Sequence, residues 1–196
     1  IVDFDIVNPY FRTADAKGYM EGKGIKVIVP LYANTNVDVP ALPAEINTLF
    51  DNREYKVVFD SGGDDLGAIA LSRYREEFLE GEYQHLFVVN IKRPMTNTVE
   101  KIEEMFHSVE YSSGLKITGI VNNTNLLGDT SINDLVEGSC VIGKAAERLG
   151  IPIIFTSGFS KVLKDAEGLR ESYNFGNMLH MKKQIWLPWE KTENRE

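Results

Sequence analysis

One stretch constrains the fold more than any other: the apolar run at residues 57–59 (VVF) ends in Asp60, and two glycines and two further acids follow it. An apolar run that stops at a carboxylate and a glycine turn predicts a buried strand entering a tight loop. In an open α/β sheet, such loops lie at the carboxyl ends of the strands, where ligands bind. A similar run, residues 2–5 (VDFD), opens the chain. We therefore expect acidic side chains at one edge of a sheet.

β-rich runs and helical patterns alternate along the rest of the chain. Several of the runs are apolar almost throughout, as strands buried on both faces of a parallel sheet are. The runs fall at residues 25–29, 56–60, 85–90, 115–122 and 151–156. Between them lie apolar stripes with helical spacing: Leu66, Ile69, Ala70, Tyr74 and Phe78; Val99, Ile102, Phe106 and Val109; and Leu135, Val136, Ile142, Ala146 and Leu149. Gly150 is the expected end of the last helix. This alternation predicts an α/β fold, with a doubly wound, mostly parallel sheet flanked by helices.

The length of 196 residues suits one domain with one core. We expect this α/β domain at residues 1–176, with a proline-containing loop at 30–44. Residues 177–196 are too apolar for a free linker, and we expect them to form a C-terminal segment that packs on the domain or on a partner. Its apolar residues include Met178, Met181, Ile185, Trp186 and Trp189.

Composition narrows the classes of partner and compartment. The net charge of −8 argues against an unaided nucleic-acid or anionic-membrane surface, so no nucleic acid is expected. No apolar run approaches the ~20 residues that span a bilayer. The single cysteine, Cys140, cannot form an internal disulfide, which fits the reducing cytoplasm, and we expect it to pack in a helix. No His or Cys pair has zinc-ligand spacing.

Taken in order, the polar strand ends resemble those of the MinD/ParA-like P-loop ATPases (the CobQ/CobB/MinD/ParA nucleotide-binding domain), a superfamily that includes the nitrogenase iron protein. Residues 2–5 resemble the strand that opens switch I, which implies that Asp5 orients or activates the attacking water near Mg²⁺. Residues 60–64 resemble the Walker B aspartate running into switch II, which implies that Asp60 and Asp64 hold Mg²⁺.

The later strand ends extend this resemblance to about residue 165. Residues 119–123 (GIVNN) resemble the strand whose terminal Asn hydrogen-bonds the adenine base, which implies that Asn123 recognises the base. Residues 152–157 lie where the family's chain wraps the base, which implies that Thr156 and Ser157 line the nucleotide site. The resemblance further implies ATP and Mg²⁺ as cofactors, an ATP-dependent homodimer and a protein partner of unknown identity.

One departure from the family concerns the phosphate loop. The family's first strand, its Gly-rich loop with the phosphate-binding Lys and the next helix would lie ahead of Ile1, in roughly 30 residues. We therefore expect a P-loop NTPase-like fold that is N-terminally truncated, with weak ATP binding and negligible turnover. Residues 138–144 match G-x-x-x-x-G-K, but Ala145 replaces the required hydroxyl and the motif lies inside a helical pattern. We expect it to be a helix.

Each of these sites also has a plainer interpretation. Glycine turns commonly follow strands, and Asn122 and Asn123 would suit a strand end that enters a turn. Lys92 and Arg93 follow another strand end and could meet phosphate, although a solvated loop is the favoured interpretation. The expected function is an ATP-binding or ATPase-type domain that acts as a nucleotide-dependent switch. The alternative is a non-catalytic α/β binding or scaffold module. A nicotinamide-type fold is disfavoured, because no G-x-G-x-x-G follows any strand.

Overall fold

The computed structural model describes residues 1–5, 12–30, 45–52, 54–63 and 65–184. The chain divides into two compact units, the first built on Ile1–Gly62 and the second comprising Gly63–Lys182. Both contain parallel strands accompanied by helices, so the chain is an α/β protein. Among the described residues, no helix has both the length and the apolar character needed to cross a membrane.

In the first unit, two short parallel strands pair, β1 (Val2–Phe4) and β2 (Phe59–Ser61). Their register places Asp3 opposite Asp60. The helical elements of this unit are η1 (Thr13–Ala16), α1 (Lys17–Glu21) and α2 (Glu45–Asp51). Phe50 of α2 stacks on Phe59, with ring centroids 5.5 Å apart, so α2 contributes to the covering of β2.

Two strand predictions in the first unit need correction. Of the run expected at 25–29, only Ile28 joins the sheet, through a single parallel bridge to Val2, although Val27 and Ile28 are buried. The run expected at 56–60 becomes β2 only from Phe59 onward, and Val58 is 60% exposed. The β-propensity of valine depends on burial against neighbouring strands, and Val58 is largely unburied. Residues 31–44 of the expected loop at 30–44 lie outside the described residues.

The second unit contains a four-stranded, all-parallel sheet in the order β3-β4-β5-β6. Its strands are β3 (Leu86–Val89), β4 (Gly119–Asn122), β5 (Ile153–Phe159) and β6 (Asn177–Met181). Three of them overlap predicted runs, whereas β6 was not predicted as a strand. It pairs with Phe155–Phe159, which also extends β5 beyond its expected end.

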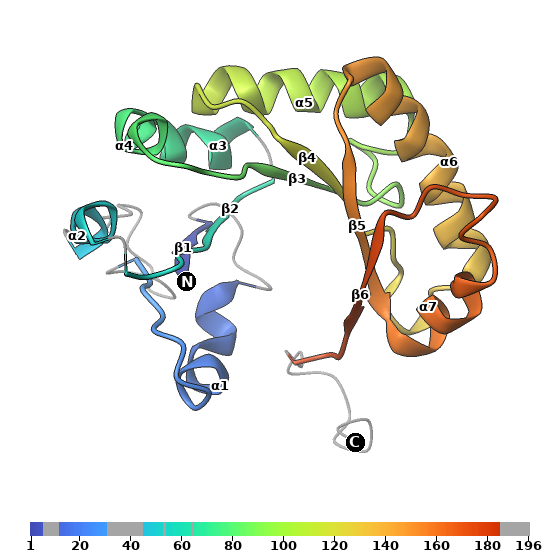
Figure 1. Cartoon of the computed structure of the whole chain (residues 1–196), viewed down its shortest axis with the longest axis horizontal. Coiled ribbons are helices and arrows are strands. Elements are labelled where there is room, and N and C mark those ends of the chain that lie inside the picture. Colours follow the sequence, from blue (N-terminus) through green and yellow to red (C-terminus); the bar gives the residue numbers. More distant parts are fainter. Residues whose placement is uncertain (6–11, 31–44, 53, 64, 185–196) are drawn as a thin grey trace. The chain divides into compact units, whose positions relative to one another are not determined.

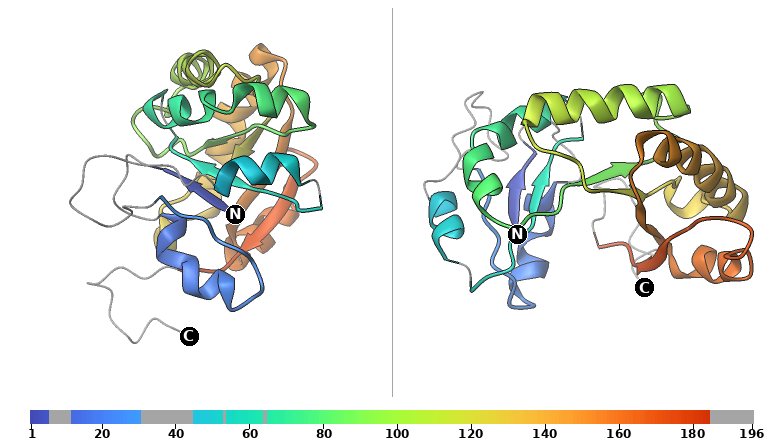
Figure 2. Two further views of the ribbon diagram at one scale, coloured as in Figure 1. Left: turned by 90° about the vertical axis from the view of Figure 1, so that its left-hand side faces the viewer. Right: turned by 45° about the horizontal axis from the view of Figure 1, so that its top comes forward.

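Helices pack against this sheet and against one another (Figure 1). They are α3 (Asp65–Ser72), α4 (Arg75–Glu80), α5 (Val99–Ser113), α6 (Ile132–Leu149) and α7 (Ser160–Glu167), with the short η2 (Leu127–Asp129) before α6. Figure 2 shows α5 and α6 beside the sheet. One core cluster joins these two helices to β3 and β4 through residues that include Phe87, Val89, Ile102, Phe106, Ile120 and Ile142.

Sequence signals at the helix ends predict α6 better than α3 and α4. Gly150 follows α6 with φ 66°, a left-handed conformation that favours glycine, so the predicted stop is confirmed. The single stripe expected over residues 66–78 is instead divided between α3 and α4. Tyr74 is the N-cap residue before α4 and is buried, whereas Ile69 is 52% exposed. Cys140 is exposed on α6, so the expectation that it packs in the interior is wrong.

Candidate functional site

In the second unit, polar side chains gather where β4 ends beside the parallel strand β5. Asn123 follows β4, and its backbone N–H donates to the carbonyl of Val89 at 2.8 Å. The hydroxyl of Ser157, on β5, donates to Asn123 Oδ1 at 2.8 Å. Ser157 is buried, whereas Asn123 is partly exposed. Two of the predicted nucleotide-binding residues are therefore in direct contact, and Ser157 fixes the orientation of the Asn123 amide.

Thr156, the third predicted residue of this group, contacts the segment that precedes β6. It is fully buried, and its hydroxyl donates to the carbonyl of Phe175 at 2.7 Å. This bond ties β5 to the segment that leads into β6. Thr156 is the register partner of Asn122, whereas Ser157 is the next residue along β5. Successive side chains of a strand point to opposite faces, so Thr156 and Ser157 lie on different faces of the sheet.

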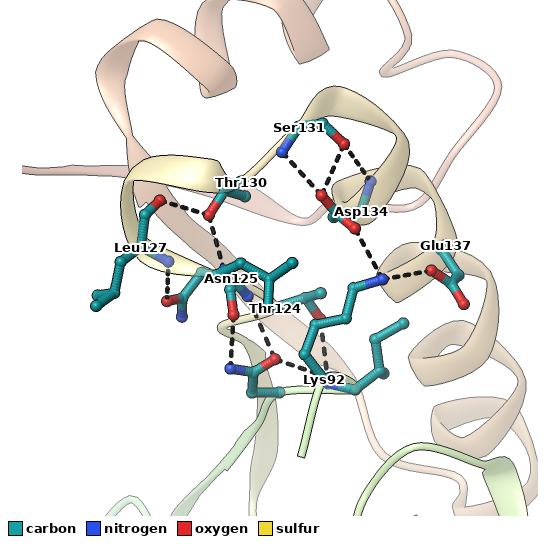
Figure 3. Close-up of polar contacts among 11 residues, drawn as sticks. Lys92, Thr124, Asn125, Leu127, Thr130, Ser131, Asp134 and Glu137 are labelled. Carbon is teal, nitrogen blue, oxygen red and sulfur yellow. Dashed lines mark hydrogen bonds and ion pairs between the residues drawn. The ribbon is translucent and has the colours of Figure 1, made fainter. Parts of the chain in front are cut away.

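Asn90 and Asn125 organise the loops around Asn123, and neither was predicted from the sequence. Asn90 Nδ2 donates to the carbonyl of Asn125 at 3.1 Å, and the N–H of Asn125 donates back to Asn90 Oδ1 at 3.3 Å. Asn125 Nδ2 donates to the carbonyl of Asn123 at 2.7 Å and lies 3.4 Å from its Oδ1. The loop after β3 is therefore fastened to the loop after β4, as Figure 3 shows for Asn125 and its neighbours.

Lys92 joins the same region to the start of α6. Its Nζ lies 2.7 Å from Asp134 Oδ1 and 2.7 Å from Glu137 Oε2 (Figure 3). Asp134 also completes a capping box with Ser131, whose hydroxyl accepts from the Asp134 N–H. Hydrogen bonds from Lys92 and Ser131 lower the pKa of Asp134 to about 2. The cation of Lys92 is therefore engaged by two carboxylates of this unit.

In the first unit, the acidic strand ends contact the segment that begins at Arg12. Asp3 is buried, and its Oδ1 lies 3.4 Å from Arg12 Nη2. Its carboxylate also accepts from the N–H groups of Asp5 and Ala14, each at 3.1 Å. Burial raises the pKa of Asp3, and the Arg12 guanidinium beside it opposes that rise. Asp3 therefore holds both its own strand end and the start of η1.

Asp60 and Thr13 form the second contact of this kind. The hydroxyl of Thr13 donates to Asp60 Oδ2, and Thr13 is buried. Asp60 is partly exposed at the centre of β2. The structure thus places one predicted metal-binding carboxylate beside a hydroxyl group. No local signal in the sequence marked Arg12 or Thr13, because their partners lie 9 and 47 positions away.

The two other predicted acids are Asp5 and Asp64. Asp5 is partly exposed and lies just beyond β1, and Asp64 lies outside the described residues. Asp5 and Asp60 belong to the first unit and Asn123 to the second, so each group is described within its own unit. Among the described residues, no three His, Cys, Asp or Glu side chains are grouped to hold a metal ion. Mg²⁺ does not require such a group, because it binds through one or two carboxylates, waters and substrate phosphates.

Comparison of the chain with protein-family models, with curated proteins and with solved structures finds no match.

Proposed function

We propose that the chain is a P-loop NTPase-like, doubly wound ATP-binding domain of MinD/ParA-like type, and that it acts as a nucleotide-dependent switch on a protein partner. The observation that carries this proposal is the hydrogen bond from Ser157, on β5, to Asn123 Oδ1, just beyond the carboxyl end of the neighbouring parallel strand β4. Ligands of open α/β sheets bind at such strand ends. ATP is the expected nucleotide, because an Asn amide matches the donor and acceptor pattern of adenine N6 and N7.

The hydrogen bonds of Asn123 leave this base contact open. An amide oxygen has two lone pairs, and Ser157 takes one of them. The approach of Asn125 Nδ2 to the same oxygen is long, at 3.4 Å, and its shorter bond is to the Asn123 carbonyl. Within the described residues, Asn123 Nδ2 donates no hydrogen bond and is not buried. We assign this group to adenine N7, and Oδ1 to the exocyclic amine.

The roles of the acids follow the same proposal. Asp60 and Asp64 hold a hydrated Mg²⁺, and Asp5 orients the attacking water. Support comes from the register of β1 and β2, which places Asp3 opposite Asp60 and brings two carboxylates together in the first unit. A bound divalent cation would offset the repulsion between these carboxylates. Nucleotide binding is further proposed to promote a homodimer, which light scattering with and without Mg²⁺-ATP would detect.

Calorimetric titration of the chain with adenosine and with Mg²⁺-ATP tests the proposal. We expect weak binding of both, and a loss of about tenfold in affinity for both in Asn123→Ala, since one bidentate contact disappears. Asn133→Ala is the matched control, because Asn133 is exposed on α6. Equal affinity for GTP and ATP would contradict the role of Asn123.

A specific observation also favours a non-catalytic binding or scaffold module. Many of the hydrogen-bonding groups in this region are already paired within the protein, as in a purely structural network. The side chains that form these bonds are Asn90, Asn125 and Ser157, which bond to one another's loops or to Asn123. That alternative predicts that adenosine and ATP do not bind, and that Asn123→Ala changes only the free energy of unfolding.

A further inference from the structure

The guanidinium of Arg12 is buried in the first unit without a full set of acceptors. Its side chain is 9% exposed, and within the described residues its guanidinium forms one ion pair, with Asp3, whereas the carboxylate of Asp15 accepts from the Arg12 backbone N–H. The ion pair is long, at 3.4 Å from Nη2 to Oδ1. Within the part of the chain that the structure describes, Arg12 Nε has no hydrogen-bond partner. A buried charged donor without an acceptor is destabilising, so its persistence needs an explanation.

The surroundings of Arg12 indicate what kind of acceptor would fit. Arg12 is directed at Asp3, whose register partner on β2 is Asp60. Register partners on neighbouring strands have their side chains on the same face of the sheet. Two carboxylates thus lie near one guanidinium, and the hydroxyl oxygen of Thr13 lies beside the Asp60 carboxylate. The group therefore combines an unused N–H donor for an anion with oxygen atoms for a cation.

Neither a simple anion nor a simple cation suits this combination. A free anion approaching Arg12 would be repelled by Asp3 and Asp60, and a free cation would be repelled by Arg12. A phosphate chain that carries its own Mg²⁺ meets both requirements. Guanidinium groups bind phosphate oxygens through directed N–H bonds, and Mg²⁺ is held by few carboxylates together with substrate phosphates.

We infer that Arg12 is a phosphate-binding residue, which donates from Nε to an oxygen of a Mg²⁺-bound polyphosphate while Asp60 and Thr13 contact the cation or its waters. This inference rests on the proposed function and deepens it, because it assigns a phosphate contact to the first unit's own residues. Arg12 touches the ligand directly, whereas Asp3 positions the guanidinium.

Tripolyphosphate with Mg²⁺ is the probe, because it carries the phosphate chain of ATP without the base. We expect the 196-residue chain to bind it, and we expect Arg12→Gln and Arg12→Lys to weaken binding by about tenfold or more, since the directed Nε bond is lost. Arg93→Gln is the matched control: Arg93 is exposed in a loop of the second unit, and its removal should leave the affinity unchanged. Loss of binding in Arg93→Gln but not in the Arg12 variants would overturn the inference.

A measurement on the unaltered chain avoids dependence on variants that fold poorly. The Nε–Hε resonance of Arg12, assigned in the unaltered chain through its bonds to the Arg12 backbone, should shift on addition of Mg²⁺-tripolyphosphate. An unshifted resonance at saturation, or no binding, would overturn the inference. The adenosine titration separates this result from the proposed function. Adenosine binding that is sensitive to Asn123→Ala, without an Arg12 shift, would leave the base site standing and remove only the role of Arg12.

Discussion

Gly138 of α6 lies so close to Thr124 that a methyl group on the glycine would come within 2.5 Å of Thr124 Oγ1 and 2.9 Å of its Cβ. Thr124 is fully buried, and its hydroxyl lies 3.5 Å from the N–H of Ile91. A methyl group at position 138 would therefore press on a side chain that is already buried. The close approach fixes the distance between α6 and the loop that carries Asn123.

Gly138→Ala should lower the free energy of unfolding of the second unit by about 1–3 kcal/mol, as overpacking of a rigid core does. The overlap with Thr124 outweighs the gain of up to ~1 kcal/mol that alanine brings to a helix interior. Gly143 provides a matched control on the same helix, since a Cβ there meets nothing within 4 Å. Gly143→Ala should therefore stabilise. Urea unfolding measures both, and a stabilising Gly138→Ala would contradict the packing argument.

Local patterns predicted those parts of the fold that local interactions determine. β3 (LFVV) is apolar throughout, β4 (GIVN) has an apolar centre, and α6 has both a capping box and a terminal glycine. β6 was missed because its sequence, NMLHM, has weak strand character, and only its pairing with β5 makes it a strand. The break between α3 and α4 at residues 73–74 has neither glycine nor proline to mark it.

In the candidate site too, local sequence predicted single residues but not the contacts between distant ones. Asn123 and Ser157 were named separately from their strand ends, and the structure joins them across 34 positions of sequence. The contacts of Asn90 with Asn125 span 35 positions, and those of Thr13 with Asp60 span 47. No periodicity encodes such partners, because they depend on strand order and loop path rather than on neighbouring residues.

The carboxylate of Asp134 should make the stability of the second unit depend on pH in the acid range. Its pKa is lowered from 3.8 to about 2, so its charged form is favoured in the folded chain. The resulting stabilisation is fully present above about pH 4 and is lost as the pH falls toward 2. Because Glu137 and part of Lys92 are exposed, solvent screening limits it to about 1 kcal/mol.

Urea unfolding between pH 2 and 5 would measure this dependence. Asp134→Asn should flatten the curve over that interval, whereas Asp129→Asn, at an exposed position of η2, should leave it unchanged. A curve for Asp134→Asn that is parallel to that of the unaltered chain would show that the Lys92 contact contributes no stability.

The bond between Ser157 and Asn123 can be measured by a double-mutant cycle. Ser157→Ala and Asn123→Ala should each lower the free energy of unfolding, and their coupling should be about 0.5–1.5 kcal/mol, as for one neutral hydrogen bond. Asn125→Ala combined with Ser157→Ala serves as the comparison, because these two side chains have no direct bond among the hydrogen bonds of the described residues. Additive effects of Ser157→Ala and Asn123→Ala would mean that the bond does not hold the Asn123 amide in place.

Among the described residues of the first unit, Asp3 should be the least tolerant of replacement. Asp3→Ala removes the acceptor of the Asp5 and Ala14 N–H groups and leaves the buried guanidinium of Arg12 without an anion. Loss of one partner of a buried ion pair typically costs about 3–5 kcal/mol. Adding Arg12→Met to Asp3→Ala should recover part of that loss, because the unpaired charge is removed as well.

Hydrogen exchange at the backbone N–H groups of Val2 and Ile28 reports this loss directly, since both donate within the first unit's sheet, to Val58 and Ile1. Their protection should fall strongly in Asp3→Ala and less in the double variant. Asp51→Ala, at an exposed position of α2, should leave the protection unchanged. If the double variant exchanged faster than Asp3→Ala, then the lost hydrogen bonds, rather than the unpaired charge of Arg12, would account for the destabilisation.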